Sequence, residues 1–171
     1  NATINPYILD VDYMRYMDQW MIAARRLGLN VRFVRSTDDL APYRVVVAPN
    51  QYTTSPEIAA NYAKYVEGGG NLVAMQRIGI FNTNGNPVHE RMPGGMTGLF
   101  GIEIDEYERC LAVNPNRLIF ADGKTPPADC RQWVFILEPK GARTLATFER
   151  DYYAGRPAAT VHDHGKGHAW Y

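Results

Sequence analysis

The sequence predicts an α/β fold with a mostly parallel sheet in its first half and a β-rich second half. Over the first 80 residues, segments with helical periodicity alternate with short runs rich in β-branched residues. Strands separated by helices form right-handed βαβ units, and such strands lie parallel. From Ile102 onward, short strand-like segments follow one another without helical crossovers. We therefore expect a single domain over residues 1–171.

The first helix is expected from Asp12 to Leu27, where apolar residues recur at steps of three and four. Gly28 follows it and can end a helix by adopting a positive φ. A short strand is predicted at Asn30–Val34. The β-branched run Arg44–Ala48 is typical of a strand buried on both faces of a parallel sheet.

A second helix is predicted to begin after Ser55, which can cap its amino terminus. Pro56 suits the first helical position, and Glu57 complements the positive end of the helix dipole. The glycines at 68–70 end this helix. A phosphate-binding loop lies between a strand and the helix that follows it. These glycines instead precede a further buried strand at Asn71–Met75, so they do not form such a loop.

The second half begins with an expected loop at Asn82–Gly95 and a short helical turn at Met96–Phe100. A tight turn is predicted at Gly165–Gly167, joining the last two strands. The expected strands are Ile102–Tyr107, Leu118–Phe120, Trp133–Leu137, Thr144–Phe148, Ala158–Val161 and His168–Tyr171.

Length, charge and hydropathy exclude several classes of protein. With 18 Lys and Arg against 18 Asp and Glu, the formal net charge is zero, which disfavours a general binder of nucleic acid or of anionic membranes. No uncharged apolar run approaches the roughly 18–20 residues that a membrane span needs. A (β/α)₈ barrel needs about 250 residues, so 171 residues cannot contain one.

Two cysteines, Cys110 and Cys130, are too few for a disulfide scaffold, and free thiols are the favoured state. The chain starts Asn1-Ala2-Thr3, without a Met and without the basic and apolar stretches of a signal peptide. We expect a piece excised from a larger chain. The compartment stays open, with the cytoplasm favoured.

The expected turn after the strand Asn71–Met75 contains no residue typical of a catalytic nucleophile. Amidotransferases and related hydrolases place a Cys or Ser on this turn, and here it reads Gln76-Arg77-Ile78-Gly79. Arg77 lies where the loops at the carboxyl ends of parallel strands form a crevice. It can bind an anion there, or form a structural ion pair, which is the favoured interpretation.

Carboxylates and histidines offer two further sites to consider. Glu103, Asp105 and Glu106 are close in sequence but alternate along an expected strand, which favours a solvated strand face over a glycosidase pair. A metal site is not predicted, although three histidines gather near the last turn and are weak candidates as ligands. They are His162, His164 and His168.

Three segments together resemble a known family. They are Tyr43–Asn50 (YRVVVAPN), Tyr65–Val73 (YVEGGGNLV) and Arg77–Ile80 (RIGI). Gly98–Glu103 and Tyr152–Ala158 agree with the same pattern. The order and spacing of these segments resemble the central, trimerisation domain of glycoside hydrolase family 42 β-galactosidases.

This resemblance implies a flavodoxin-like, class I glutamine amidotransferase-like three-layer sandwich without amidotransferase chemistry. It also implies a non-catalytic oligomerisation domain, because in that family the catalytic glutamates lie on a separate barrel. No catalytic residue and no cofactor carries over. The partners implied are further copies of the chain, as a trimer, and the catalytic barrel of the parent, which would hydrolyse terminal β-D-galactosides.

The resemblance departs from the family at the amino terminus, where only Tyr7–Val11 can supply the usual first strand. Two other functions stay open: a standalone amidotransferase-like hydrolase, and a small sugar- or ligand-binding module. Loops at the expected strand ends supply the candidates for an interface or cleft. These residues are Tyr52, Arg77, Ile80, Phe81 and His89.

Overall fold

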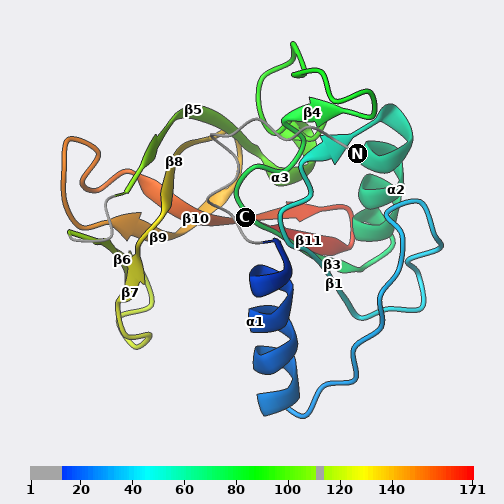
Figure 1. Ribbon diagram of the computed structural model, residues 1–171, viewed down its shortest axis with the longest axis horizontal. Coiled ribbons are helices and arrows are strands. Elements are labelled where there is room, and N and C mark those ends of the chain that lie inside the picture. Colours follow the sequence, from blue (N-terminus) through cyan, green and yellow to red (C-terminus); the bar gives the residue numbers. More distant parts are fainter. Residues whose placement is uncertain (1–12, 111–113) are drawn as a thin grey trace. The chain divides into compact units, whose positions relative to one another are not determined.

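The computed structural model describes residues 13–110 and 114–171. The chain divides into two compact units, the first ending at Asp38 and the second running from Asp39 to Tyr171 (Figure 1). Over the described ranges, no helix combines the length and the apolar character needed to cross a membrane. The possible first strand at Tyr7–Val11 lies outside the described residues.

The first unit contains helix α1 (Tyr13–Arg26), in agreement with the predicted helix. Gly28 has a φ of +68°, and the backbone N–H of Leu29 donates to the carbonyl of Ala24, which confirms the expected glycine end of the helix. The predicted strand at Asn30–Val34 is wrong, because residues 29–35 carry no regular secondary structure. Alternating apolar residues form a strand only when a neighbouring strand pairs with them.

The second unit is built on a curled mixed sheet of seven strands, of which β1 and β7 are the edges among the described residues (Figure 1). Strands β1 and β3 confirm the two strands expected in the first half. The expected burial of β1 on both faces is wrong, because exposed and buried residues alternate along it and Val45 is 54% exposed. In spatial order the strands are β1 (Val45–Ala48), β3 (Asn71–Ala74), β11 (Gly167–Trp170), β10 (Pro157–His164), β9 (Arg143–Phe148), β6 (Asn116–Phe120) and β7 (Ala128–Cys130).

The expected mostly parallel, flavodoxin-like sandwich is wrong. Within the described sheet, β3 runs parallel to β1 and to β11, whereas the pairs β11–β10, β10–β9, β9–β6 and β6–β7 are antiparallel. The alternation of strand and helix stops at β3. The next position in the sheet is taken by the last strand of the chain, which arrives through the β10–β11 hairpin and needs no helical crossover.

Two small sheets complete this unit. Strands β2 (Thr53–Thr54) and β4 (Phe81–Asn82) are parallel, and neither was predicted. Strands β5 (Ile102–Arg109) and β8 (Trp133–Pro139) form an antiparallel pair, as expected for the β-rich half. The short helix α3 (Thr97–Phe100) confirms the predicted helical turn.

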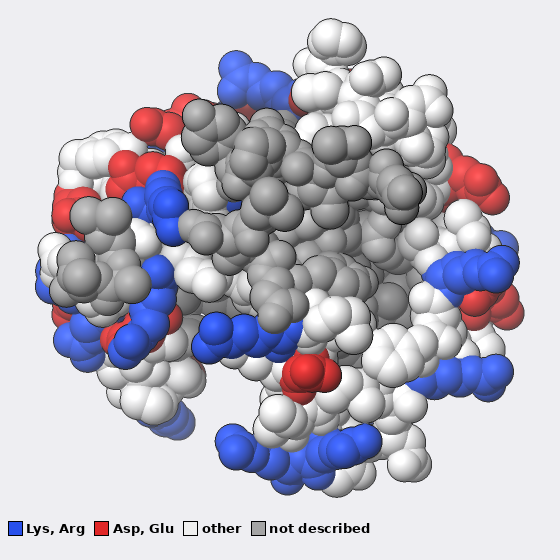
Figure 2. Space-filling model, viewed as in Figure 1, with Lys and Arg blue, Asp and Glu red and all other residues white. Residues whose placement is uncertain are grey.

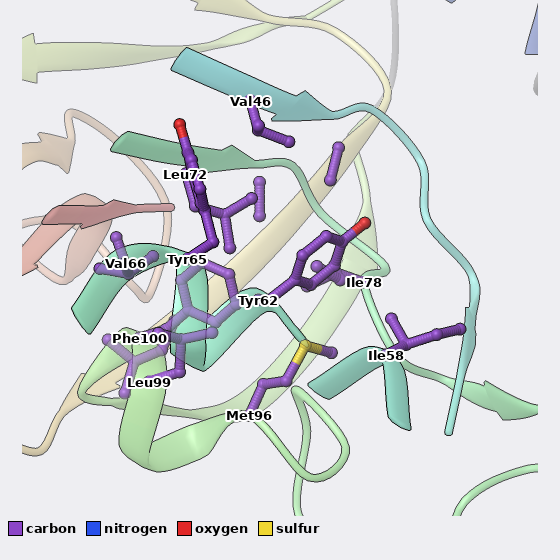
Figure 3. Packing of buried hydrophobic residues seen from close by; sticks show 14 of the residues in the cluster. Val46, Ile58, Tyr62, Tyr65, Val66, Leu72, Ile78, Met96, Leu99 and Phe100 are labelled. Atoms are coloured by element: carbon purple, nitrogen blue, oxygen red, sulfur yellow. The ribbon is translucent and has the colours of Figure 1, made fainter. Parts of the chain in front are cut away.

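Helix α2 (Pro56–Glu67) packs against the sheet beside β3 and β11. As predicted, Ser55 caps it, and the Ser55 hydroxyl accepts a hydrogen bond from the backbone N–H of Ile58 at 3.2 Å. Its buried side chains meet those of β3 and of α3 in one apolar cluster (Figure 3). This cluster includes Val46, Ile58, Tyr62, Tyr65, Val66, Leu72, Ile78, Met96, Leu99 and Phe100.

Candidate functional site

The carboxyl ends of β1 and β3 bring two strained residues to one place. Asn50 follows β1 with a φ of +49°, and Arg77 follows β3 with a φ of +69°. The two loops are joined by a hydrogen bond from the N–H of Gly79 to the carbonyl of Gln51 at 2.9 Å. Left-handed backbone at residues other than glycine is uncommon and gathers at functional sites. This strand end is therefore the first place to look for a site.

The Arg77 side chain is buried, with 6% of its surface exposed. Its guanidinium carbon lies 4.0 Å from the centroid of the Trp133 ring and 5.9 Å from that of Tyr52. Among the described residues no carboxylate pairs with it, and its Nη1 has no hydrogen-bond partner. The ion pair favoured for Arg77 is thus not formed within the described chain, and aromatic rings contact the cation instead.

Four of the five residues predicted for the interface or cleft lie together at this strand end. Tyr52 and Phe81 are joined by a backbone hydrogen bond of 2.9 Å from the N–H of Phe81 to the carbonyl of Tyr52. Ile80 precedes Phe81 and is half-buried, whereas His89 is exposed in the following loop. Tyr52 and Phe81 are half-buried as well, so these two side chains and Ile80 offer little free surface to a partner.

Three residues of this site were not predicted. Asn50 is 4% exposed, and its Nδ2 lacks a partner among the described residues. Trp133 comes from β8 and Tyr171 from the end of the chain. The backbone of Arg77 lies at the Tyr171 hydroxyl, and burial raises the pKa of that hydroxyl above its usual range. Asn50 could have been found, since Asn tolerates positive φ, but no local signal ties Trp133 or Tyr171 to Arg77.

The two cysteines come from the β-rich half, and both are free thiols. The Cys130 thiol donates to the carbonyl of Trp133 at 3.3 Å. The Cys110 thiol donates to the carbonyl of Cys130 at 2.9 Å. Burial, and the proximity of Cys110, raise the pKa of the Cys130 thiol to about 11. A thiol that stays protonated at neutral pH is a poor nucleophile, so this environment disfavours a nucleophilic role for Cys130.

The three candidate histidines have separate partners. His162 Nδ1 lies 2.9 Å from the carbonyl of Leu99, and His168 Nδ1 lies 2.8 Å from Asp163 Oδ1. His164 Nε2 is 3.3 Å from Glu67 Oε1. Over residues 13–110 and 114–171, no three His, Cys, Asp or Glu side chains are grouped to hold a metal ion.

The carboxylates of β5 form surface ion pairs. Glu103 Oε2 lies 3.2 Å from Arg91 Nη1, and Asp105 Oδ2 lies 3.0 Å from Arg156 Nη2. All four side chains are partly or largely exposed. A glycosidase holds its two carboxylates across a sugar site, and a solvated, ion-paired strand face is a different arrangement.

Comparisons with known proteins agree on one family. The family described as the β-galactosidase trimerisation domain matches residues 2–171. β-Galactosidase BgaA of Clostridium cellulovorans is 29% identical over 168 residues, which are 98% of this chain and 25% of that protein. β-Galactosidase BgaB of Geobacillus sp. is 32% identical over 159 residues, which are 93% of this chain and 23% of that protein. The chain thus spans about a quarter of the length of these relatives.

Solved structures give the same result. The β-galactosidase from Rahnella sp. R3 superposes with a TM-score of 0.90 at 28% identity, over 94% of this chain and 24% of that one. The β-galactosidase from Bacillus circulans sp. alkalophilus also reaches 0.90, at 25% identity, over 95% of this chain and 24% of that one. The chain belongs to the trimerisation-domain family of glycoside hydrolase family 42 β-galactosidases.

Proposed function

We propose that this chain is a non-catalytic module that joins three copies of a longer β-galactosidase. The family match over residues 2–171 carries this proposal, because it covers the chain almost completely. The relatives are about four times as long, as their 25% and 23% coverage indicates. The remaining length in such a protein is ample for a catalytic barrel of about 250 residues, which would hydrolyse terminal β-D-galactosides. We place residues 1–171 as one domain of that protein.

The chemistry of the described residues supports a non-catalytic role. The turn that carries the nucleophile in amidotransferase-like hydrolases holds Arg77, which is buried. The carboxylates Glu103 and Asp105 are in ion pairs on the surface. Free thiols at Cys110 and Cys130 are typical of a reducing compartment, so we propose that the protein acts in the cytoplasm.

Light scattering coupled to size exclusion tests the assembly role. A closed, symmetric trimer is expected at about 58 kDa, which is three times the 19.3 kDa of one chain. A monomer of 19.3 kDa at every concentration up to that of a typical crystallisation sample would overturn the proposal. The same preparation should show no turnover of a nitrophenyl β-galactoside, and measurable turnover would contradict the non-catalytic role.

The strand end around Arg77 supports a second role, as a binding site for a small ligand with a carboxylate or hydroxyl groups. Arg77 Nη1, Asn50 Nδ2 and the Tyr52 hydroxyl are buried without partners among the described residues. Leaving such groups unpaired costs about 1–3 kcal/mol each, and a ligand would recover part of it. A thermal-shift screen of small carboxylates and sugars tests this role, with Arg77→Met as the variant that should lose the response.

A further inference from the structure

Cys110 and Cys130 are in contact inside the second unit. Cys110 is 7% exposed and belongs to a small apolar cluster of the β-rich half, and Cys130 packs against that cluster. The Cys110 thiol donates a hydrogen bond to the carbonyl of Cys130 at 2.9 Å. We call Cys110 and Cys130 the thiol pair.

Asn116 is a neighbour of both cysteines. Its backbone N–H donates to Cys110 Sγ at 3.3 Å, and it stands opposite Cys130 in the β6–β7 ladder. Asn116 is 1% exposed, and its side chain donates to the carbonyl of Arg150 at 2.8 Å. Hydrogen bonds of the sheet therefore hold the thiol pair in contact. Two groups that the fold already holds together react with each other far more readily than two that must first meet.

The thiol pair also contacts the short segment that joins β7 to β8. The backbone N–H of Cys110 donates to the carbonyl of Gln132 at 2.8 Å, and the Cys130 thiol donates to that of Trp133 at 3.3 Å. Trp133 is the first residue of β8, and its ring lies against the Arg77 guanidinium. A change at the thiol pair therefore acts directly on the residue that contacts Arg77.

We propose that Cys110 and Cys130 form a reversible disulfide, with a low-molecular-weight disulfide such as oxidised glutathione as the oxidant, and that its formation moves Trp133. In the thiol form each S–H group donates a hydrogen bond, from Cys110 to Cys130 and from Cys130 to Trp133. A disulfide has no S–H group, so oxidation removes both bonds. The Cys130 side chain turns from the Trp133 carbonyl to Cys110 Sγ, and the Trp133 backbone loses that contact.

The oxidation takes place in two steps of thiol–disulfide exchange. Cys130 is half-buried whereas Cys110 is buried, so the oxidant meets the Cys130 sulfur first. The Cys130 thiolate attacks one sulfur of the oxidant, whose S–S bond breaks and releases one thiolate. The Cys110 thiolate then attacks the Cys130 sulfur of this mixed disulfide and releases the second thiolate. The thiol pair has lost two electrons and two protons, which leave with the oxidant as two thiols.

The surroundings of the two sulfurs set the rates of these steps. Burial and the nearness of Cys110 raise the pKa of Cys130 to about 11, so the first step is slow at neutral pH. The second step is favoured, because the Asn116 N–H donates to Cys110 Sγ and such a bond stabilises a thiolate. In a reducing compartment the thiol pair rests as two thiols, and it responds to lasting oxidation.

The surface around β6 and β7 carries both signs of charge. Figure 2 shows Lys and Arg in blue beside Asp and Glu in red over this region. Arg117 is paired with Glu149 at 3.1 Å, and Arg131 with Asp129 at 2.6 Å. Paired charges leave little net field to attract or repel an ion. Oxidised glutathione and a neutral disulfide such as 2-hydroxyethyl disulfide should therefore react at similar rates.

Incubation of the folded chain with oxidised glutathione tests the disulfide. The sequence holds no other cysteine, so alkylation followed by intact mass spectrometry counts the remaining thiols directly. We expect a species that has lost two hydrogen atoms and carries no alkyl group, formed about tenfold faster for each pH unit from 7 to 9. Its melting temperature should rise by about 5–10 °C, because the disulfide closes a ring in the chain. Dithiothreitol should restore both thiols.

Single substitutions separate the two steps and the effect on Trp133. Cys110→Ala should stop at the mixed disulfide of glutathione with Cys130. Cys130→Ala, whose remaining sulfur is buried, should react with the oxidant at least about tenfold more slowly than the wild type. Oxidation of the wild type should change its tryptophan fluorescence, and Trp133→Phe should remove that change.

Three outcomes would overturn the proposal. The folded chain keeps both thiols, or forms only mixed disulfides, in a large excess of oxidised glutathione at pH 9. The internal disulfide forms only in urea, so that the native contact plays no part. The disulfide forms in the folded chain but the Trp133 fluorescence stays the same, which would refute the movement of Trp133. The proposed disulfide is independent of the assembly role, which light scattering on the reduced chain tests separately.

Discussion

The Arg77 guanidinium lies 4.0 Å from the centroid of the Trp133 ring, so it joins the turn after β3 to the first residue of β8. A cation on an aromatic face contributes about 2 kcal/mol when it is removed from water. Burying a guanidinium without a carboxylate costs several kcal/mol. The balance of these two effects decides whether the Arg77 side chain raises or lowers the free energy of unfolding.

We predict that Arg77→Met has an unfolding free energy equal to that of the wild type or higher by about 1 kcal/mol, because desolvation outweighs the cation–π contact. Trp133→Ala should instead lose about 3 kcal/mol, since the ring packs against the core. Urea denaturation without added ligand measures both. A loss of more than about 2 kcal/mol in Arg77→Met would show that the guanidinium has a stabilising partner.

The sequence signals that predicted the fold correctly are local ones. Ser55 and Pro56 mark the start of α2, and the β-branched run before Pro49 marks β1, because capping and strand propensity act within a few residues. The position of β11 is not a local property. Its register beside β3, with His168 opposite Asn71, is set by the β10–β11 hairpin, so the parallel order was predicted wrongly after β3.

The sequence predicted only the part of the candidate site that comes from the loops after β1 and β3. The carboxyl ends of neighbouring parallel strands lie at one end of a sheet, so the loops that follow them come together. The loops after β1 and β3 carry Tyr52, Arg77, Ile80 and Phe81. Trp133 reaches Arg77 from a strand far along the chain, and pairing of β5 with β8 places it there. Such a contact depends on tertiary packing and leaves no pattern in the surrounding sequence.

Insertion of β11 beside β3 depends on Gly167. A Cβ at this position would lie 2.2 Å from the carbonyl oxygen of Gly70 and 2.4 Å from that of Val66. Both obstacles are backbone atoms, so they cannot turn aside as a side chain can. We predict that Gly167→Ala lowers the unfolding free energy by about 2–3 kcal/mol or more.

Thermal or urea unfolding measures this loss, and Gly98→Ala is the matched control. Gly98 lies in α3, and no atom comes within 4 Å of a Cβ built there. The control should equal the wild type or gain up to about 1 kcal/mol from helix propensity. Equal stability of Gly167→Ala and the wild type would show that β11 does not approach β3 and α2 as closely as described.

Stability at high pH should depend on Tyr62, whose side chain is 3% exposed in the apolar cluster of α2. Burial raises the pKa of Tyr62 to about 12. The unfolded chain releases this proton near pH 10, while the folded chain holds it, so the unfolded state binds fewer protons between pH 10 and 12. The unfolding free energy therefore falls as the pH rises through this window, by about 2 kcal/mol from this group.

We predict that between pH 10 and 12 the free energy of unfolding of Tyr62→Phe falls by about 2 kcal/mol less than that of the wild type. The variant has no phenol proton to release in the unfolded state. Urea denaturation at several pH values measures the difference, and Tyr107→Phe, at a side chain 53% exposed, should follow the wild type. Parallel curves for Tyr62→Phe and the wild type would contradict the prediction. The Tyr62 ring is among the buried side chains that meet β3. A difference in unfolding free energy between variant and wild type that does not change with pH would therefore also mean that water reaches the Tyr62 hydroxyl in the folded chain.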